Sequence, residues 1–221
     1  MSRPAMSRRR FLTLAGIAGV GLCTCGGLGA WGLSSPRAAF SQPSCGGEGT
    51  LGEWVLIAYA SKCGSTAEVA EAIGQTLCAA GAAVDVRRVQ EVRDLTPYRA
   101  VVVGTAIRMG EPLGEAVSFA KKHQAALAGL PTAVFSLGTA MIHDTPENRA
   151  TAAGYLQPLT ELVRPVSTGL FAGKVDPAKM EPIWRFMMSF VKEGEMAPGD
   201  HRDWDAIRAW ATELNAALAG A

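Results

Sequence analysis

The chain has 221 residues, of which 48% are hydrophobic, and a formal net charge of +1 at pH 7. This length suits one domain with an extension, and the apolar content is enough for a large core. Five of the 21 basic residues precede residue 38 and no acidic residue precedes Glu48, so residues 38–221 carry a net charge of −4. A mildly acidic body argues against nucleic acid as the main partner.

Residues 1–40 have the form of a targeting segment. Three arginines precede an uncharged run over residues 11–36, and the sequence across this junction is Ser7-Arg8-Arg9-Arg10-Phe11-Leu12. The Ser-Arg-Arg-x-Phe-Leu pattern resembles a twin-arginine export signal. An ordinary secretory signal or a membrane anchor is the alternative, and the run is long enough to span a bilayer. We therefore expect a signal or anchor helix, then a linker over residues 41–52, then a body over residues 53–221 outside the cytoplasm.

The five cysteines are scattered along the chain. Cys23 and Cys25 lie in the apolar run, Cys45 lies in the linker, and only Cys63 and Cys78 belong to the body. There is no CxxC pair, and the three histidines have no ligand spacing with the cysteines. We therefore expect neither a disulfide framework nor a metal site.

The body alternates predicted strands and helices. Apolar or alternating runs predict strands over residues 54–60, 83–89, 100–104, 131–136 and 166–172, and helical spacing predicts helices over residues 66–80, 113–128, 144–163, 180–193 and 203–218. Strands that alternate with helices indicate βαβ units on a parallel sheet. The fold class that fits is α/β, a doubly wound five-stranded sheet of order 2-1-3-4-5 with helices on both faces.

Three segments of small residues follow the first, third and fourth predicted strands. In this architecture ligands bind beyond the carboxyl ends of the strands, so we expect the three segments to share one edge. The first, Ser61–Thr66, combines hydroxyls with a helix start and suits a phosphate group. It lacks the GxxxxGK[ST] pattern of nucleotide triphosphatases. The acidic cluster of a response-regulator receiver is also missing, because Ser61 and Thr105-Ala106 occupy those positions.

The string Ser61-x-Cys63-Gly64-Ser65-Thr66 resembles the phosphate loop of flavodoxins, with cysteine replacing the middle hydroxyl residue. The longer strings Tyr59–Thr66, Gly104–Gly110 and Gly199–Trp204 resemble a branch that contains flavodoxin-domain proteins and menaquinone-dependent protoporphyrinogen oxidases. The resemblance covers residues 54–218 and implies a non-covalent FMN, whose flavin carries the chemistry.

The resemblance also implies where FMN binds. The first segment would hold the phosphate, and the other two would flank the isoalloxazine ring. The candidate cofactor-binding residues are Ser61, Lys62, Cys63, Gly64, Ser65, Thr66, Thr105, Ala106, Ile107, Arg108, Met109, Gly110, Ser136, Leu137, Gly138 and Thr139. Neither flavin-facing segment contains an aromatic residue, so Ile107, Met109 and Met141 would pack against the ring.

Three of these residues have two interpretations each. Lys62 either pairs with the phosphate or is a solvated loop residue. Cys63, at a helix start, is either a reactive thiol or a small polar substitute. Arg108 either neutralises a reduced flavin or a substrate carboxylate, or pairs at the surface with Glu111 or Glu115.

Residues 180–193 include Trp184, Phe186, Met187, Met188 and Phe190. They form either a helix packed on the core or an exposed surface for a quinone, a membrane or a partner. Together with residues 11–36 they are the candidates for membrane association.

The leading functional hypothesis is an exported FMN protein that transfers electrons with an unidentified redox partner protein or quinone. The first alternative is a protoporphyrinogen oxidase-like dehydrogenase that uses menaquinone, and the second is a flavin-free binding module of the same fold.

Overall fold

The computed structural model describes residues 44–45, 53–176, 178 and 198–220, which all belong to one compact unit, Ala38–Ala221. The predicted signal segment, most of the linker and the predicted helix over residues 180–193 lie outside the described residues. The strands are β1 (Ser44–Cys45), β2 (Trp54–Ala60), β3 (Ala83–Arg88), β4 (Tyr98–Arg108), β5 (Glu111–Pro112), β6 (Thr132–Gly138), β7 (Ser167–Ala172), β8 (Lys174–Val175) and β9 (Gly199–Asp200). The helices are α2 (Ser65–Ala79), α3 (Gly114–Lys122), α4 (Gln124–Leu127), the 3₁₀-helix η1 (Thr139–Ile142), α5 (Pro146–Val163) and α7 (Trp204–Ala219).

The central sheet has the strand order β1-β3-β2-β4-β6-β7. All pairs among β3, β2, β4, β6 and β7 are parallel, and β1 adds an antiparallel edge to β3. The five parallel strands reproduce the predicted order 2-1-3-4-5. The predicted α/β doubly wound fold is therefore confirmed, with a short edge strand added.

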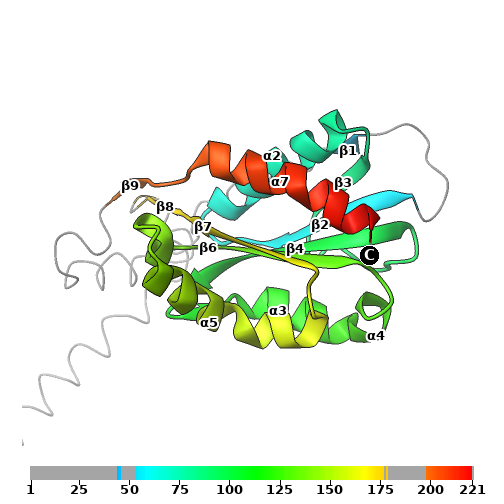
Figure 1. The fold of residues 1–221 in the computed structure, drawn as a ribbon. Helices are drawn as coiled ribbons and strands as arrows, with labels where there is room; N and C mark the ends of the chain where they lie inside the picture. Colours follow the sequence, from blue (N-terminus) through cyan, green and yellow to red (C-terminus); the bar gives the residue numbers. More distant parts are fainter. Residues whose placement is uncertain (1–43, 46–52, 177, 179–197, 221) are drawn as a thin grey trace, which may run out of the picture. The chain divides into compact units, whose positions relative to one another are not determined.

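Helices cover both faces of this sheet (Figure 1). On β2, Val55, Ile57 and Tyr59 pack in the core beneath α2 and α7. Leu56 and Ala58 alternate with them and pack in the second core beneath α3 and α5. Because successive side chains of a strand point to opposite faces, a strand covered on both sides reads as one continuous apolar run.

Local signals place the helix boundaries. Thr145 caps α5, with its Oγ1 accepting from the Asn148 N–H at 3.2 Å, and Pro146 occupies the first turn. Asp203 caps α7 through hydrogen bonds from the N–H groups of Asp205 and Ala206. The single helix predicted over residues 113–128 is divided into α3 and α4.

The expectation about cysteines requires a correction, because Cys45 and Cys78 form a disulfide. Cys45 pairs with Val84 in the β1–β3 register, and Cys78 lies near the end of α2. The two Cα atoms are 6.2 Å apart. The two cysteines are 33 positions apart in the sequence, and only the packing of α2 against β3 brings them together. Ser44 and Cys45, assigned to the linker from sequence, are thus part of the sheet.

Across the ranges that the structure describes, no helix is both long and apolar enough to cross a membrane. Within the same ranges, no three acidic, histidine or cysteine side chains come together as metal ligands would.

Candidate flavin site

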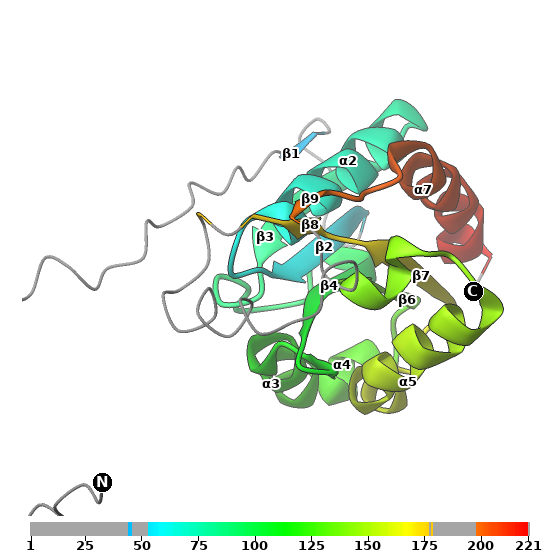
Figure 2. The ribbon, with the colours of Figure 1, turned by 90° about the vertical axis from the view of Figure 1, so that its left-hand side faces the viewer.

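The three predicted segments meet at one edge of the sheet, which faces the viewer in Figure 2. They follow or end the neighbouring strands β2, β4 and β6, which are joined in register by the pairs Ala60↔Thr105 and Thr105↔Ser136. The α2, α5 and α7 helices also begin at this edge (Figure 1, left). The edge therefore combines the carboxyl ends of parallel strands with the positive ends of helix dipoles, as expected for an anion-binding edge.

The first segment is a tight turn that opens α2. Gly64 has φ 96° and ψ −23°, a left-handed conformation that favours glycine. The Ser61 hydroxyl is buried and accepts a hydrogen bond from the Gly64 N–H at 3.0 Å. No side chain among the described residues caps α2, so the N–H groups of its first turn can donate to an external acceptor.

The Thr66 side chain lies in the first turn of α2 and is 0% exposed. Its Oγ1 has no hydrogen-bond partner among the described residues. An unsatisfied buried hydroxyl is costly, and a phosphate oxygen bound at the helix start would supply the missing acceptor. The segment therefore fits a phosphate group.

Two residues of the first segment differ in their surroundings. Lys62 forms an ion pair with Glu115 of α3, and this hydrogen bond lowers the pKa of the Glu115 carboxyl. Cys63 is half-buried and stands outside the disulfide. Lys62 thus joins the first segment, Ser61–Thr66 (the phosphate segment), to α3 on the other face of the sheet. Glu115, which was one candidate partner of Arg108, is paired with Lys62.

The second segment is a hairpin rather than the expected loop. β4 continues through Arg108, and Met109 (φ 55°) and Gly110 (φ 79°) form the turn into β5. The Thr105 hydroxyl is buried and accepts from the Leu113 N–H at 3.0 Å, which anchors the returning strand. The predicted loop was wrong here because antiparallel pairing with β5 extends the strand. Met109 stands at the tip and is 75% exposed.

The third segment also begins as strand. Ser136, Leu137 and Gly138 are the last residues of β6, and Thr139 starts η1. The loop expected at Leu137 and Gly138 was therefore wrong, because both still pair with β7. A Cβ added at Gly138 would lie 3.3 Å from the Ile107 Cβ, so the second and third segments are in close contact.

Side chains from distant parts of the chain complete the site. A Cβ added at Gly110 would lie 3.1 Å from Cε1 of Tyr155, which places this α5 aromatic beside the hairpin turn. No local signal marked Tyr155, because the contact depends on how α5 crosses the sheet. Met141, which was expected to pack against the flavin ring, is buried in a small cluster with Ala152 and Ala172.

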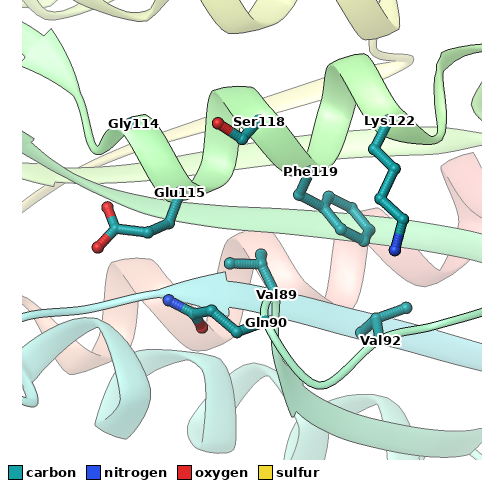
Figure 3. A pocket seen from close by; sticks show the side chains of 8 residues that line it. All are labelled: Val89, Gln90, Val92, Gly114, Glu115, Ser118, Phe119 and Lys122. Atoms are coloured by element: carbon teal, nitrogen blue, oxygen red, sulfur yellow. The ribbon is translucent and has the colours of Figure 1, made fainter.

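A surface groove of about 510 Å³ lies beside α3 (Figure 3). Val89, Val92 and Phe119 supply its apolar side chains, and Glu115 and Lys122 supply charge. None of the predicted cofactor-binding residues lines it. Glu115 belongs to this groove and also pairs with Lys62, so the groove adjoins the phosphate segment without being part of the predicted site.

Comparison with known protein families assigns the chain to one of them. The flavodoxin domain model matches residues 56–202, which include all three segments. The chain belongs to the flavodoxin domain family. Membership supports a flavin cofactor and a redox function, and the Ser61–Thr66 turn fits the phosphate group that such a cofactor carries. FMN is the usual flavin of this flavodoxin domain family.

Curated relatives of this flavodoxin-domain protein include protoporphyrinogen IX dehydrogenase [quinone] of Escherichia coli strain K12. The two are 25% identical over 170 residues, which are 72% of this chain and 93% of that protein. Similar solved structures include a cysteine-to-serine mutant of flavodoxin from Pseudomonas aeruginosa, 22% identical with a TM-score of 0.47, covering 76% of this chain and 99% of that one. Oxidised flavodoxin 2 from Bacillus cereus is 22% identical with a TM-score of 0.43, covering 75% and 97%.

Proposed function

We propose that this protein is an exported flavoprotein that binds FMN without a covalent bond and exchanges electrons with a redox partner or a quinone. The observation that carries the proposal is the Thr66 hydroxyl, which is buried at the start of α2 near the left-handed Gly64 and has no hydrogen-bond partner among the described residues. Bound FMN would supply reversible hydride and electron transfer. The chain would supply amides and hydroxyls for the phosphate and two strand ends for the ring.

The phosphate assignment is tested by Thr66→Val in the full chain, titrated with FMN by fluorescence quenching. The substitution removes a hydrogen bond to a charged group, worth roughly 1.5–3 kcal/mol, so we expect the FMN Kd to rise about 10- to 100-fold. Thr76→Val is the matched control in the same helix, because its hydroxyl donates to the Ala72 carbonyl instead. Equal FMN affinity in wild type and Thr66→Val would reject the assignment, and a wild type that takes up no FMN would favour a flavin-free module.

Export is part of the proposal and has two supports. The Ser7–Leu12 pattern matches a twin-arginine signal. The Cys45–Cys78 disulfide suits an oxidising compartment outside the cytoplasm, because intracellular thiols are usually kept reduced. Replacing Arg8 and Arg9 together by lysine should leave the protein in the cytoplasm, measured by cell fractionation. Normal export of that variant would rule out the twin-arginine route.

A second candidate function follows from the relative that shares 25% identity over 93% of its length. That protein is named for protoporphyrinogen IX and a quinone, so we propose the same donor and acceptor classes as the enzyme alternative. The proposed export counts against this enzyme function, because haem synthesis is ordinarily cytoplasmic. Protoporphyrinogen consumption with a soluble menaquinone analogue separates the two candidates. Turnover no faster than with free FMN would reject the enzyme function and favour the electron carrier.

A further inference from the structure

Arg202 is a nearly buried arginine that joins two carboxylates. Its side chain is 3% exposed. Nε and Nη2 donate to the two oxygens of Asp200 at 2.7 and 2.5 Å, and Nη1 donates to Glu68 Oε2 at 2.7 Å. The guanidinium also lies over the Trp204 ring, 4.4 Å from its centroid. These contacts hold the guanidinium in one orientation, because its planar, permanently charged group forms hydrogen bonds in fixed directions.

One of the two carboxylates lies at the phosphate segment. Glu68 is in the first turn of α2, and its N–H donates to the Gly64 carbonyl at 3.1 Å. It follows Thr66 by two residues. A carboxylate there is favourable to the helix dipole, but it repels a phosphate group bound at the same helix start. Its negative charge therefore needs a compensating cation when an anion binds.

The other carboxylate ties Arg202 to the end of the sheet. Asp200 belongs to β9 and pairs with Lys174 of β8, directly after β7. The His201 N–H donates to the Gly173 carbonyl at 3.2 Å, which fixes the chain next to Arg202. The guanidinium is thus anchored from the β7 side and reaches across to α2.

We propose that Arg202 is a positioning residue for the flavin phosphate: it offsets part of the negative charge of Glu68 and fixes the orientation of that side chain, so the start of α2 keeps its attraction for a phosphate group. This inference rests on the proposed FMN function and extends it by a residue 134 positions from Glu68 in the sequence. It assigns the C-terminal string Gly199–Trp204 a role in phosphate affinity, although none of its residues lies in the three predicted segments.

The test compares FMN with riboflavin, which has the same ring and no phosphate. In the full chain, Arg202→Gln should raise the FMN Kd about tenfold, because it leaves one negative charge unbalanced near the phosphate dianion. The riboflavin Kd should change less than about twofold, because riboflavin has no phosphate to repel. Adding Glu68→Gln to that variant should restore the FMN preference. Arg208→Gln is the matched control, because Arg208 pairs with Asp205 on the exposed side of α7.

The remaining variants keep the inference falsifiable if Arg202→Gln folds poorly. Arg202→Lys keeps the charge and should keep most of the FMN preference. Glu68→Gln alone, at a side chain 45% exposed, should bind FMN at least as tightly as wild type. Equal losses for FMN and riboflavin, or no restoration in the double variant, would overturn the inference alone. Wild-type protein that binds neither flavin would overturn the proposed function and this inference with it.

Discussion

Among single residues, Gly104 determines how the core beneath the site packs, because it makes room for a buried aromatic ring. It lies in β4 next to Phe135 of β6 and is paired with it in register. A Cβ at position 104 would lie 2.2 Å from Phe135 Cζ, far inside van der Waals contact. Phe135 is fully buried and also contacts Trp210 of α7, with ring centroids 6.2 Å apart. The ring can occupy this place only because position 104 has no side chain.

We therefore predict that Gly104→Ala destabilises the protein by roughly 1–3 kcal/mol, the usual cost of overpacking a close-packed core. Urea unfolding followed by far-ultraviolet circular dichroism measures the change. Gly154→Ala is the control, because Gly154 is exposed within α5 and nothing lies within 4 Å of an added Cβ. That variant should gain up to about 1 kcal/mol from better helix propensity. A Gly104→Ala protein as stable as wild type would mean that Phe135 can move aside.

At the scale of elements, the disulfide fastens the edge strand β1 to α2. β1 has only two residues and two register pairs with β3, which is too little to hold an edge strand by itself. The bond to Cys78 keeps Ser44 and Cys45 on the sheet, where they cover the outer edge of β3. Cys45 is thereby fixed covalently to α2.

We predict that Cys45→Ser and Cys78→Ser each lower stability by about 3–4 kcal/mol, the loop-entropy value for a closed loop of this length. For a protein of this size the thermal midpoint should fall by about 10 °C. Reductant should lower the wild type to the level of the variants and leave the variants unchanged. A wild type that does not respond to reductant while thiol counting shows the bond reduced would contradict the prediction.

For the whole molecule, mild acid should act first through His123. Burial lowers the pKa of His123 below its ordinary value of 6.5, and Lys122 adds to this effect. Nε2 of the ring is buried and has no partner among the described residues, while the ring packs on Phe119 at 4.9 Å. The folded state therefore favours the neutral imidazole.

The sign of the pH dependence follows from linkage. A lowered folded-state pKa means that the unfolded chain binds the proton first, so stability is complete above pH 6.5 and falls as the pH drops below it. Glu115 and Asp200 also have lowered pKa values, through Lys62 and Arg202, and add a second loss at more acidic pH. Urea midpoints measured from about pH 8 to about pH 2 test both losses, and His123→Gln should flatten the first step. A wild-type midpoint that stays constant through the first step would contradict it.

Local patterns in the sequence were enough for most of the architecture. The continuous apolar runs at residues 54–60 and 100–104 indicated strands covered on both faces, and Thr145-Pro146 marked a helix start; β2, β4 and α5 confirm them. These signals are local because side-chain periodicity and capping depend on neighbouring residues. The Ser61–Thr66 segment likewise opens α2 where the pattern placed it.

Contacts between segments that are distant in the sequence could not be predicted from local patterns. The hairpin that turns Thr105–Gly110 from loop into strand needs pairing with β5, and Cys45 meets Cys78 only when α2 packs against β3. Tyr155 reaches Gly110, and Arg202 reaches Glu68, through the crossing of whole elements over the sheet. Local sequence patterns alone predict a parallel α/β body whose first helix opens with a turn suited to a phosphate group. The tertiary structure decided which side chains surround that turn, because such contacts depend on packing between segments that no local pattern encodes.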